Sequence, residues 1–392
     1  MSNDTSKSLP RGWRVLRFDR FAESVTERVD PAEANTERYV GLEHLDPESL
    51  TIRRWGSPTD VIGQKLRFRA GDVIYGRRRA YQRKLAMPDF DGICSAHAMV
   101  LRAREGVMLQ RFLPFFMQSE TFHQRALQIS VGSLSPTINW RTLAAQEFII
   151  PPLDEQRRIA DILWAADAEK CALQDAVGKL DQLASALGVE VFDKRPARQI
   201  SLGDLAKRGL LKFQTGPFGT VLKASSYVEE GVPVVNPVNM INGKIVTTDG
   251  PFLDDDECKR LERYRVTTSD IILGRKGDVG RAIYITPEYD GYIIGSDIIR
   301  IRLTGGLLES RYLYCFLRSF PARFWLARNS PGTTMPGINE RILSRLKTPI
   351  PSLPEQGQVI QAFDALDEAS DRLQAKVQSN ANLMHSLVNR LL

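Results

Sequence analysis

The stretch TINWRTLAAQEFIIPPLDEQ at 137–156 returns as GINERILSRLKTPIPSLPEQ at 337–356, so this chain contains an internal repeat of long period. Ile138, Pro151 and Gln156 are among the positions that keep their residue type 200 positions later. Such self-similarity constrains the architecture more than any single motif does, because each copy must form the same kind of unit. We therefore expect two related halves.

The likeness between the copies extends upstream of this segment. GSLSPTIN at 132–139 lies over GTTMPGIN at 332–339, again at an offset of 200. Nearer the start of each half, GDVIYGRRR at 71–79 aligns with SDIILGRKG at 269–277 at an offset of 198. The smaller offset indicates that the two halves differ by insertions in their earlier parts.

Downstream of the repeated segment, apolar residues recur at alternating three- and four-residue steps, the spacing of a seam between packed helices. The seam positions are Ile159, Leu173, Val177, Leu180 and Leu187 in the first copy and Val359, Leu366, Leu373, Val377 and Leu387 in the second. Lys170 interrupts the first stripe. Asn380 stands where the first copy has Leu180, and a polar residue on a seam can fix its register.

Each stripe predicts a helix of about 35 to 40 residues, at 1.5 Å of rise per residue. Ser352 and Glu355 have the spacing of a capping box and Pro354 suits a first turn, so the second helix is expected to begin near residue 353. Two stripes of matching length most simply cover each other. The alternative is that each helix packs on its own half or on another subunit.

The segments before each long helix predict strands with a few helices. DIILG at 270–274 and DIIRIRL at 297–303 are rich in β-branched residues, and RYLYCFLRSFPARFWLA at 311–327 has helical spacing. The expected fold class is α+β, with a repeated globular domain alternating with a long helix. The predicted boundaries are 1–150 and 193–350 for the two domains, and 151–192 and 351–392 for the two spacer helices.

Composition places the chain among soluble proteins. Hydrophobic residues make up 43% and charged residues 26%, and the longest apolar runs are too short to span a bilayer. The polar start and the scattered Cys94, Cys171, Cys258 and Cys315 favour a cytoplasmic location. The net charge of +6 permits an anionic partner without requiring one.

Basic residues follow the same predicted strand in both halves. A basic loop at a strand end can neutralise phosphates and place donors on guanine edges, and small hydroxyls in the glycine loops at 132–136 and 332–336 suit phosphate contacts. A solvated charged surface, or a turn shaped only by Gly and Pro, is the alternative. The candidate DNA-binding residues are Arg77, Arg78, Arg79, Gln82, Arg83, Lys84, Ser133, Ser135, Arg275, Lys276, Arg281, Thr333 and Thr334.

Catalytic motifs are scarce. The chain contains neither a G-x-x-x-x-G-K-[ST] phosphate loop nor an H-E-x-x-H zinc motif. NPVN at 236–239 lacks the second proline and the aromatic residue of an adenine methyltransferase motif. Glu257 and Lys259 have the acid-x-lysine spacing of metal-dependent nucleases, although a short acidic turn explains them more simply. We expect no catalytic residue and no metal site.

The paired segments IPPLDEQRRIADIL and IPSLPEQGQVIQAF, each preceded by a glycine–hydroxyl loop and followed by a long helix, resemble the specificity subunit of type I restriction-modification systems. The resemblance covers essentially the whole chain. It implies two target recognition domains separated by an antiparallel coiled coil, with pseudo-two-fold symmetry. It also implies that the helices serve as a docking surface for other subunits.

The same resemblance implies a function in phage defence. Such a chain recognises a bipartite, asymmetric target in double-stranded DNA and is not itself an enzyme. Two modification subunits methylate adenine at N6 with S-adenosylmethionine, and restriction subunits act as a motor nuclease with ATP and Mg, so this chain binds no cofactor. A related system without a motor, a self-sufficient nuclease using Glu257 and Lys259, and a two-headed structural adaptor are the alternatives.

Overall fold

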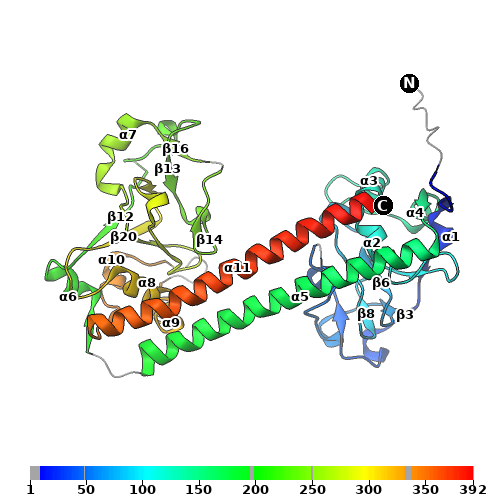
Figure 1. Cartoon of the computed structure of the whole chain (residues 1–392), viewed down its shortest axis with the longest axis horizontal. Coiled ribbons are helices and arrows are strands. Elements are labelled where there is room, and N and C mark those ends of the chain that lie inside the picture. The colour runs from blue at the N-terminus through cyan, green and yellow to red at the C-terminus, as the bar shows by residue number, and fades with distance from the viewer. Residues whose placement is uncertain are drawn as a thin grey trace. The chain divides into compact units, whose positions relative to one another are not determined.

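A computed structural model describes residues 9–47, 49–194, 198–219, 221–248, 250–331 and 337–391. The chain divides into two compact units, residues 1–175 with 374–392 and residues 176–373. Two long helices, α5 (Leu153–Val189) and α11 (Leu353–Leu391), each contribute a stretch to both units (Figure 1). Their lengths of 37 and 39 residues confirm the predicted range.

Two small sheets and a strand pair form the first unit. β1 (Arg14–Arg17) pairs with β10 (Glu147–Ile150) in antiparallel register. The larger sheet has the order β2 (Ala22–Val25), β9 (Ala98–Ala103), β6 (Val73–Gly76), β7 (Leu85–Ala86), and the second has the order β3 (Arg28–Val29), β5 (Lys65–Phe68), β8 (Gly92–Cys94), β4 (Tyr39–Val40). The short helices are α1 (Phe18–Phe21), α2 (Leu113–Gln118), α3 (Glu120–Gln128) and α4 (Trp140–Ala144).

The core of this unit is an aromatic cluster onto which parts of both long helices pack. Phe18, Phe116, Phe122 and Phe148 lie in contact at its centre. Ile159 and Leu163 from the start of α5, and Met384 and Val388 from the end of α11, belong to the same buried cluster. Because the beginning of one helix meets the end of the other, the two run antiparallel in this unit.

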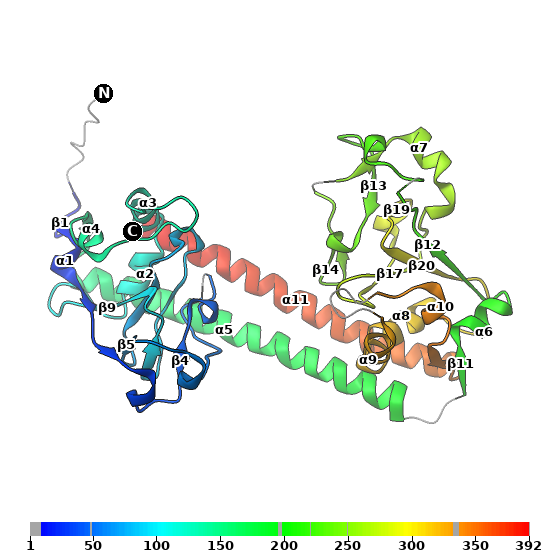
Figure 2. The ribbon, with the colours of Figure 1, turned by 180° about the vertical axis from the view of Figure 1, so that it is seen from behind.

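The second unit repeats this plan with additions. β11 (Gln199–Ser201) pairs with β21 (Lys347–Pro349), and the larger sheet has the order β12 (Leu211–Thr215), β20 (Ile298–Leu303), β17 (Ile271–Gly274), β18 (Ala282–Tyr284). A second sheet has the order β16 (Phe252–Leu253), β13 (Val232–Val235), β19 (Ile293–Ile294), and β14 (Met240–Ile241) pairs with β15 (Lys244–Ile245) (Figure 2). The helices are α6 (Leu202–Lys207), α7 (Asp255–Arg260), α8 (Ser310–Arg318), α9 (Phe320–Asn329) and α10 (Glu340–Leu343).

The sheet β2-β9-β6-β7 of the first unit and the sheet β12-β20-β17-β18 of the second follow the same sequence of pairings. In each sheet, the first strand in sequence (β2 or β12) pairs with the last one (β9 or β20). The last strand also pairs with the strand that precedes the basic loop (β6 or β17). This confirms an α+β fold with a duplicated domain. The segment 311–327, predicted to be helical from its spacing, forms two helices, α8 and α9. The break lies at Ser319, whose hydroxyl donates to the Phe316 carbonyl at 2.6 Å. Ser119 makes the same bond to Phe116.

A fully buried glutamine fixes the start of each long helix. The side-chain oxygen of Gln156 accepts the Leu109 N–H at 2.8 Å, and its amide nitrogen donates to the carbonyls of Val107 and Pro151, both at 2.9 Å. Three of the four hydrogen bonds that a carboxamide can make are thus satisfied. The first turn of α5 is thereby joined to the loop that precedes α2.

Gln356 makes the equivalent contacts in the second unit. Its oxygen accepts the Glu309 N–H at 2.9 Å, and its nitrogen donates to the carbonyls of Leu307 at 3.1 Å and Pro351 at 3.0 Å. α11 begins at Leu353 as predicted, and the Glu355 carboxylate accepts the Ser352 N–H at 2.8 Å. The repeated proline and glutamine are therefore explained by one structural joint.

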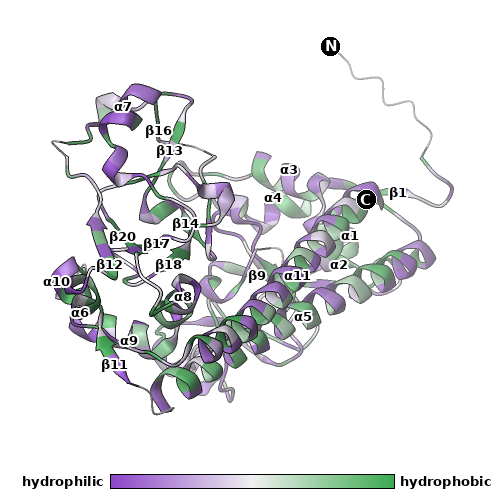
Figure 3. Cartoon of the chain, turned by 60° about the vertical axis from the view of Figure 1, so that its left-hand side comes forward, coloured by the Kyte–Doolittle hydropathy of each residue, from purple (hydrophilic) through white to green (hydrophobic). Residues whose placement is uncertain are grey.

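The predicted seam residues lie on the covered sides of the two helices. Ile159 and Val359 are buried, and the remaining ones are half-buried: Leu173, Val177, Leu180, Leu187, Leu366, Leu373, Val377 and Leu387. Figure 3 shows apolar residues recurring along both α5 and α11. Asn380 is buried and donates to Glu169 at 3.1 Å, and Lys170 lies beside Asp167 at 3.3 Å, so the seam contains a polar layer in the first unit.

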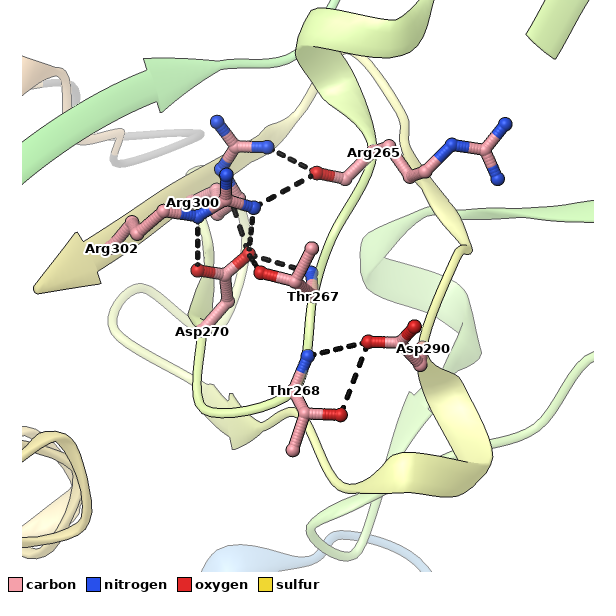
Figure 4. Close-up of polar contacts among 7 residues, drawn as sticks. All are labelled: Arg265, Thr267, Thr268, Asp270, Asp290, Arg300 and Arg302. Atoms are coloured by element: carbon pink, nitrogen blue, oxygen red, sulfur yellow. Dashed lines mark hydrogen bonds and ion pairs between the residues drawn. The ribbon is translucent and has the colours of Figure 1, made fainter.

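A buried carboxylate organises the central strands of the second unit (Figure 4). Asp270 accepts two hydrogen bonds from Arg302, Nε to Oδ1 at 2.7 Å and Nη2 to Oδ2 at 2.6 Å, and it also accepts the Thr267 N–H. Arg300 is 8% exposed and donates to the Arg265 carbonyl. Its burial, followed by the neighbouring Arg302, lowers the pKa of the Arg300 guanidinium.

The first unit has the same ion pair without the second arginine. Arg102 donates to both oxygens of Asp72 at 2.8 and 2.9 Å, and the position of Arg300 is taken by the buried Val100. The paired Asp and Arg are thus part of the shared scaffold. Arg300, by contrast, is present only in the second domain and distinguishes it from the first.

The glutamine joint gives a stability prediction. Gln156→Leu keeps the side-chain volume close but leaves the Leu109 N–H and two carbonyls buried without partners, so the free energy of unfolding of the first unit should fall by about 3 kcal/mol. Denaturant unfolding measures the change. Gln182→Leu, at an exposed position of the same helix, is the matched control and should shift stability by less than about 0.5 kcal/mol. Equal effects of the two variants would contradict the joint.

Candidate nucleic-acid interface

A basic loop leaves the larger sheet of the first unit at the end of β6. Arg79 and Arg83 both adopt the left-handed backbone conformation, with φ of 56° and 50°, on either side of a 3₁₀ turn at Ala80–Gln82. The Gly76 N–H donates to the Lys84 carbonyl at 2.9 Å, so the loop leaves and rejoins the sheet at one point. Arg78, Arg79 and Tyr81 are exposed, and Gln82 is half-buried.

The predicted glycine–hydroxyl loop lies directly against this basic loop. Val131 and Thr137 pair across the base of the hydroxyl loop, and Thr137 in turn pairs with Arg78. The Arg78 Nε donates to the Ser135 hydroxyl at 2.7 Å, and the Arg79 N–H donates to the Pro136 carbonyl at 2.7 Å. The two stretches therefore form one continuous surface, which we call the first basic surface, residues 77–84 with 131–137.

Exposed apolar side chains border the exposed arginines on this surface. Ser133 is exposed, Leu134 at the tip of its loop is 92% exposed, and Val131 is 72% exposed. Cations beside exposed apolar groups on a loop are a combination seen in proteins that contact both the backbone and the bases of nucleic acids. The first basic surface can therefore make more than phosphate contacts.

Several basic side chains of this surface have partners within the unit. Arg77 donates to the Ala96 carbonyl at 3.0 Å, Lys84 donates to the Leu42 carbonyl at 2.7 Å, and Arg83 pairs with Glu120. Hydrogen bonds from Gln124 and then from Arg83 lower the pKa of Glu120. The charges of these three residues are thus partly committed to holding the loop.

The second basic loop, residues 275–281 after β17, is more heavily neutralised. Lys276 lies 3.1 Å from Asp297, and Arg281 donates to Asp278 at 3.2 Å. Arg275 is half-buried and donates to the carbonyls of Ile338 at 3.1 Å and Ser296 at 3.3 Å. Thr333 and Thr334, the hydroxyls predicted to accompany this loop, lie outside the described residues.

Two of the predicted DNA-binding positions perform the same structural role in each unit. The guanidinium groups of Arg77 and Arg275 both donate to the loop before the last strand of the larger sheet. Their backbone carbonyls both accept the N–H of the repeated isoleucine, at 3.0 Å from Ile138 and 2.9 Å from Ile338. These arginines therefore tie three segments together.

Lys84 and Arg281 are a second equivalent pair. Lys84 donates to the Leu42 carbonyl, and Arg281 donates to the carbonyls of Pro237 at 3.1 Å and Met240 at 2.8 Å. In both units the accepting carbonyls belong to a 3₁₀ turn or to the residue that ends it. In the second unit, this turn is the NPVN segment at 236–239. NPVN is thus a structural turn, in which Asn239 accepts the Asn236 N–H at 2.9 Å.

Some exposed groups were not predicted from the sequence. Phe218 is 58% exposed, and the Arg275 guanidinium lies over its ring at 5.5 Å from the centroid. In the first unit, the Arg38 guanidinium lies 4.5 Å from the centroid of the Trp55 ring and 4.4 Å from that of Phe90, and the two rings contact each other. These partners are distant in sequence, so only the tertiary structure reveals them.

The residues considered for nuclease chemistry pair with their neighbours on α7. Glu257 lies 2.5 Å from Arg260, whose hydrogen bonds lower the pKa of Glu257, and Lys259 lies 3.1 Å from Asp256. Within the described ranges, no group of three or more His, Cys, Asp or Glu side chains is placed to hold a metal ion. None of the helices in these ranges has both the length and the apolar content of a membrane span.

A duplicated α+β domain with a basic loop at the same strand end, together with two long helices that contribute to both units, defines a class of internally repeated proteins. The family model for the type I restriction modification DNA specificity domain matches residues 62–183 and 218–381, well over half of the sequence. The chain belongs to this family.

Two curated relatives are similar to the chain in sequence. It is 26% identical over 198 residues to the type I restriction enzyme EcoDI specificity subunit of Escherichia coli, which covers 48% of this chain and 44% of that protein. It is 21% identical over 401 residues to the type I restriction enzyme MjaVIII specificity subunit of Methanocaldococcus jannaschii, covering 98% of this chain and 93% of that one. The chain therefore spans less than half of the first relative and nearly all of the second.

Two solved structures share the fold. The type I restriction-modification system S subunit from M. genitalium matches with a TM-score of 0.61 at 14% identity, covering 100% of this chain and 98% of that one. A chain from a structure of a type I R-M system, described for its complex assembly and conformational transition, matches with a TM-score of 0.57 at 19% identity and 98% coverage of both chains.

The structural role of Arg275 can be separated from ligand binding. Arg275→Ala removes the donor to two carbonyls that lie in half-buried surroundings, so the second unit should lose about 2 kcal/mol of unfolding free energy. Lys276→Ala, at the neighbouring exposed position, should cost less than about 0.5 kcal/mol. Denaturant unfolding without DNA makes the comparison. If the Arg275 variant were as stable as the parent protein, Arg275 would not be holding the segments at Ser296 and Ile338 together.

Proposed function

We propose that this chain is the DNA-reading subunit of a type I restriction-modification complex and recognises a bipartite, asymmetric target. The observation that carries the proposal is the pair of basic loops, each at the same strand end of a duplicated domain and each unlike the other in sequence. Membership of the specificity family supports it. One domain would read one part of the target.

The chemistry of the first basic surface suits double-stranded DNA. Arg78 and Arg79 are exposed, and so is Ser133 in the adjoining glycine–hydroxyl loop. Guanidinium groups pair with phosphates and with guanine edges, and hydroxyls on tight loops contact phosphates. In the second domain, Lys276 and the exposed ring of Phe218 offer a different combination. Unlike contact groups read unlike sequences, and an asymmetric target follows.

The reaction itself is assigned to partner subunits. Two modification subunits would methylate adenine at N6 using S-adenosylmethionine, and restriction subunits would translocate and cleave DNA using ATP and Mg. This chain then binds no cofactor and contributes no catalytic residue, and it acts in the cytoplasm. The long helices, α5 and α11, would serve as the docking surface for the partners, because their exposed residues include apolar side chains, among them Ile162, Leu183 and Leu383.

Two other functions remain as alternatives to be tested. A related system without a motor would use the same recognition subunit with a combined modification and nuclease protein. A self-sufficient nuclease would require Glu257 and Lys259 to act together, which the pairing of each with a neighbour on α7 does not favour. Cleavage by the purified chain with magnesium alone would support the nuclease.

The proposed function predicts a specific footprint. The chain assembled with its modification subunits should protect two short segments separated by an unprotected spacer, and its affinity should fall steeply as salt rises because phosphate neutralisation releases counterions. Binding that is uniform along any duplex, or that is indifferent to salt, would contradict the proposal. Reversing the charge of Arg78 and Arg79 together should abolish the protection of one segment at least.

A further inference from the structure

Two residues of the first basic surface, Arg79 and Arg83, occupy a backbone conformation that their side chains disfavour, and of these Arg83 pairs with Glu120. Arg79 has φ of 56°, in the left-handed region where the Cβ atom lies too close to the backbone. Glycine adopts this region without penalty, and asparagine is the commonest other residue found there. An arginine at such a position is therefore not explained by local backbone preference.

The second unit shows what the fold alone requires at this position. Arg78 pairs with Thr137 as Lys276 pairs with Gly337, so the next residues, Arg79 and Gly277, are equivalent. Gly277 has φ of 74°. The same turn thus exists with glycine in one copy and with arginine in the other.

Packing within the domain does not offset the unfavourable conformation of Arg79. A Cβ atom added to Gly277 would meet no heavy atom within 4 Å, so the equivalent position is open. By contrast, a Cβ atom at Gly280 would lie 2.8 Å from Leu326, and glycine is needed there for space. Position 79 therefore has room for a side chain that the core does not use.

The guanidinium group of Arg79 is also distinct from those of its neighbours. Arg77, Arg78 and Arg83 each have a hydrogen-bond or ion-pair partner, whereas the described part of the chain offers the exposed Arg79 side chain none. Its backbone, however, is fixed by the bond from its N–H to the Pro136 carbonyl at 2.7 Å. The side chain is uncommitted on a backbone that is held in place.

We propose that Arg79 is a specificity-determining residue of the first domain and donates to the edge of a guanine in its half of the target. A phosphate can be neutralised by a flexible cation on relaxed backbone, whereas bidentate donation to guanine O6 and N7 requires a fixed direction of approach. The contact with DNA would then offset the backbone strain. This inference rests on the proposed function and assigns its chemistry to one residue.

The test is Arg79→Gly in the full chain assembled with its modification subunits. Relief of the left-handed strain should leave the melting temperature unchanged or raise it by about 2 °C. Selection from duplexes randomised in each half-site should show that the preference for one G·C pair in the first half-site falls roughly 10- to 100-fold. The preferences in the second half-site should be unchanged. A purely structural role cannot produce a stable variant with this loss.

Asn35→Gly is the matched control. Asn35 also has a positive φ, of 47°, in the same unit and outside the basic surface, so the substitution relieves similar strain and should leave every base preference intact. A uniform loss of affinity across all sequences, with a salt dependence shallower by about one charge, would overturn base reading in favour of a phosphate contact. Unchanged binding and unchanged base preference in the Arg79 variant would show that its side chain makes no contact with DNA, which would overturn the proposal. Failure of the parent complex to select a target would instead overturn the proposed function itself.

Discussion

The buried carboxamide at the start of each long helix is the interaction on which the rest of the architecture depends. Gln156 and Gln356 are fully buried, and each is held by one N–H and two carbonyl groups from a loop and from the preceding proline. A buried amide without these partners would be costly, so the helix can leave its domain in only a narrow range of directions. A reading domain fixed to a helix in this way can place its basic loop reproducibly.

Equivalent residues outside these joints show how one scaffold supports two different surfaces. The Asp72–Arg102 pair and the Asp270–Arg302 pair are the same in both units, as are the ties made by Arg77 and Arg275. What changes lies around them. Arg300 replaces Val100 in the sheet, and on the short helix after Ser319 the exposed Phe320 and Phe324 stack where the first unit has Glu120 and Gln124. The duplication retained these pairs and ties, and it varied a buried position of the sheet as well as the exposed surface.

The sequence predicted the features that depend on periodicity and local spacing. The repeat gave the duplicated domain, the apolar stripe gave the long helices and their lengths, and Ser352 with Glu355 placed the start of α11. These signals are local or regular, and tertiary structure did not override them. The break at Ser319 was missed because the apolar spacing continues across it on both sides.

The candidate interface was harder to predict at the level of single residues. A run of arginines shows where positive charge gathers, but the carbonyl that each guanidinium reaches is set by strands distant in sequence. Arg77 and Arg275, for example, were predicted to face DNA, and the run of arginines did not reveal that they donate to the carbonyls of Ala96 and Ser296. The sequence alone also could not show that Arg79 adopts a glycine-like conformation, because that follows from the pairing of its loop with Thr137.

The central claim is that each domain reads one half of a two-part target. Its most direct test exchanges residues 1–150 for those of another member of the family and maps the methylated adenines in cells that express the complete system. The account predicts that one half of the methylated sequence changes while the other half is kept. A change in both halves, or in neither, would contradict it.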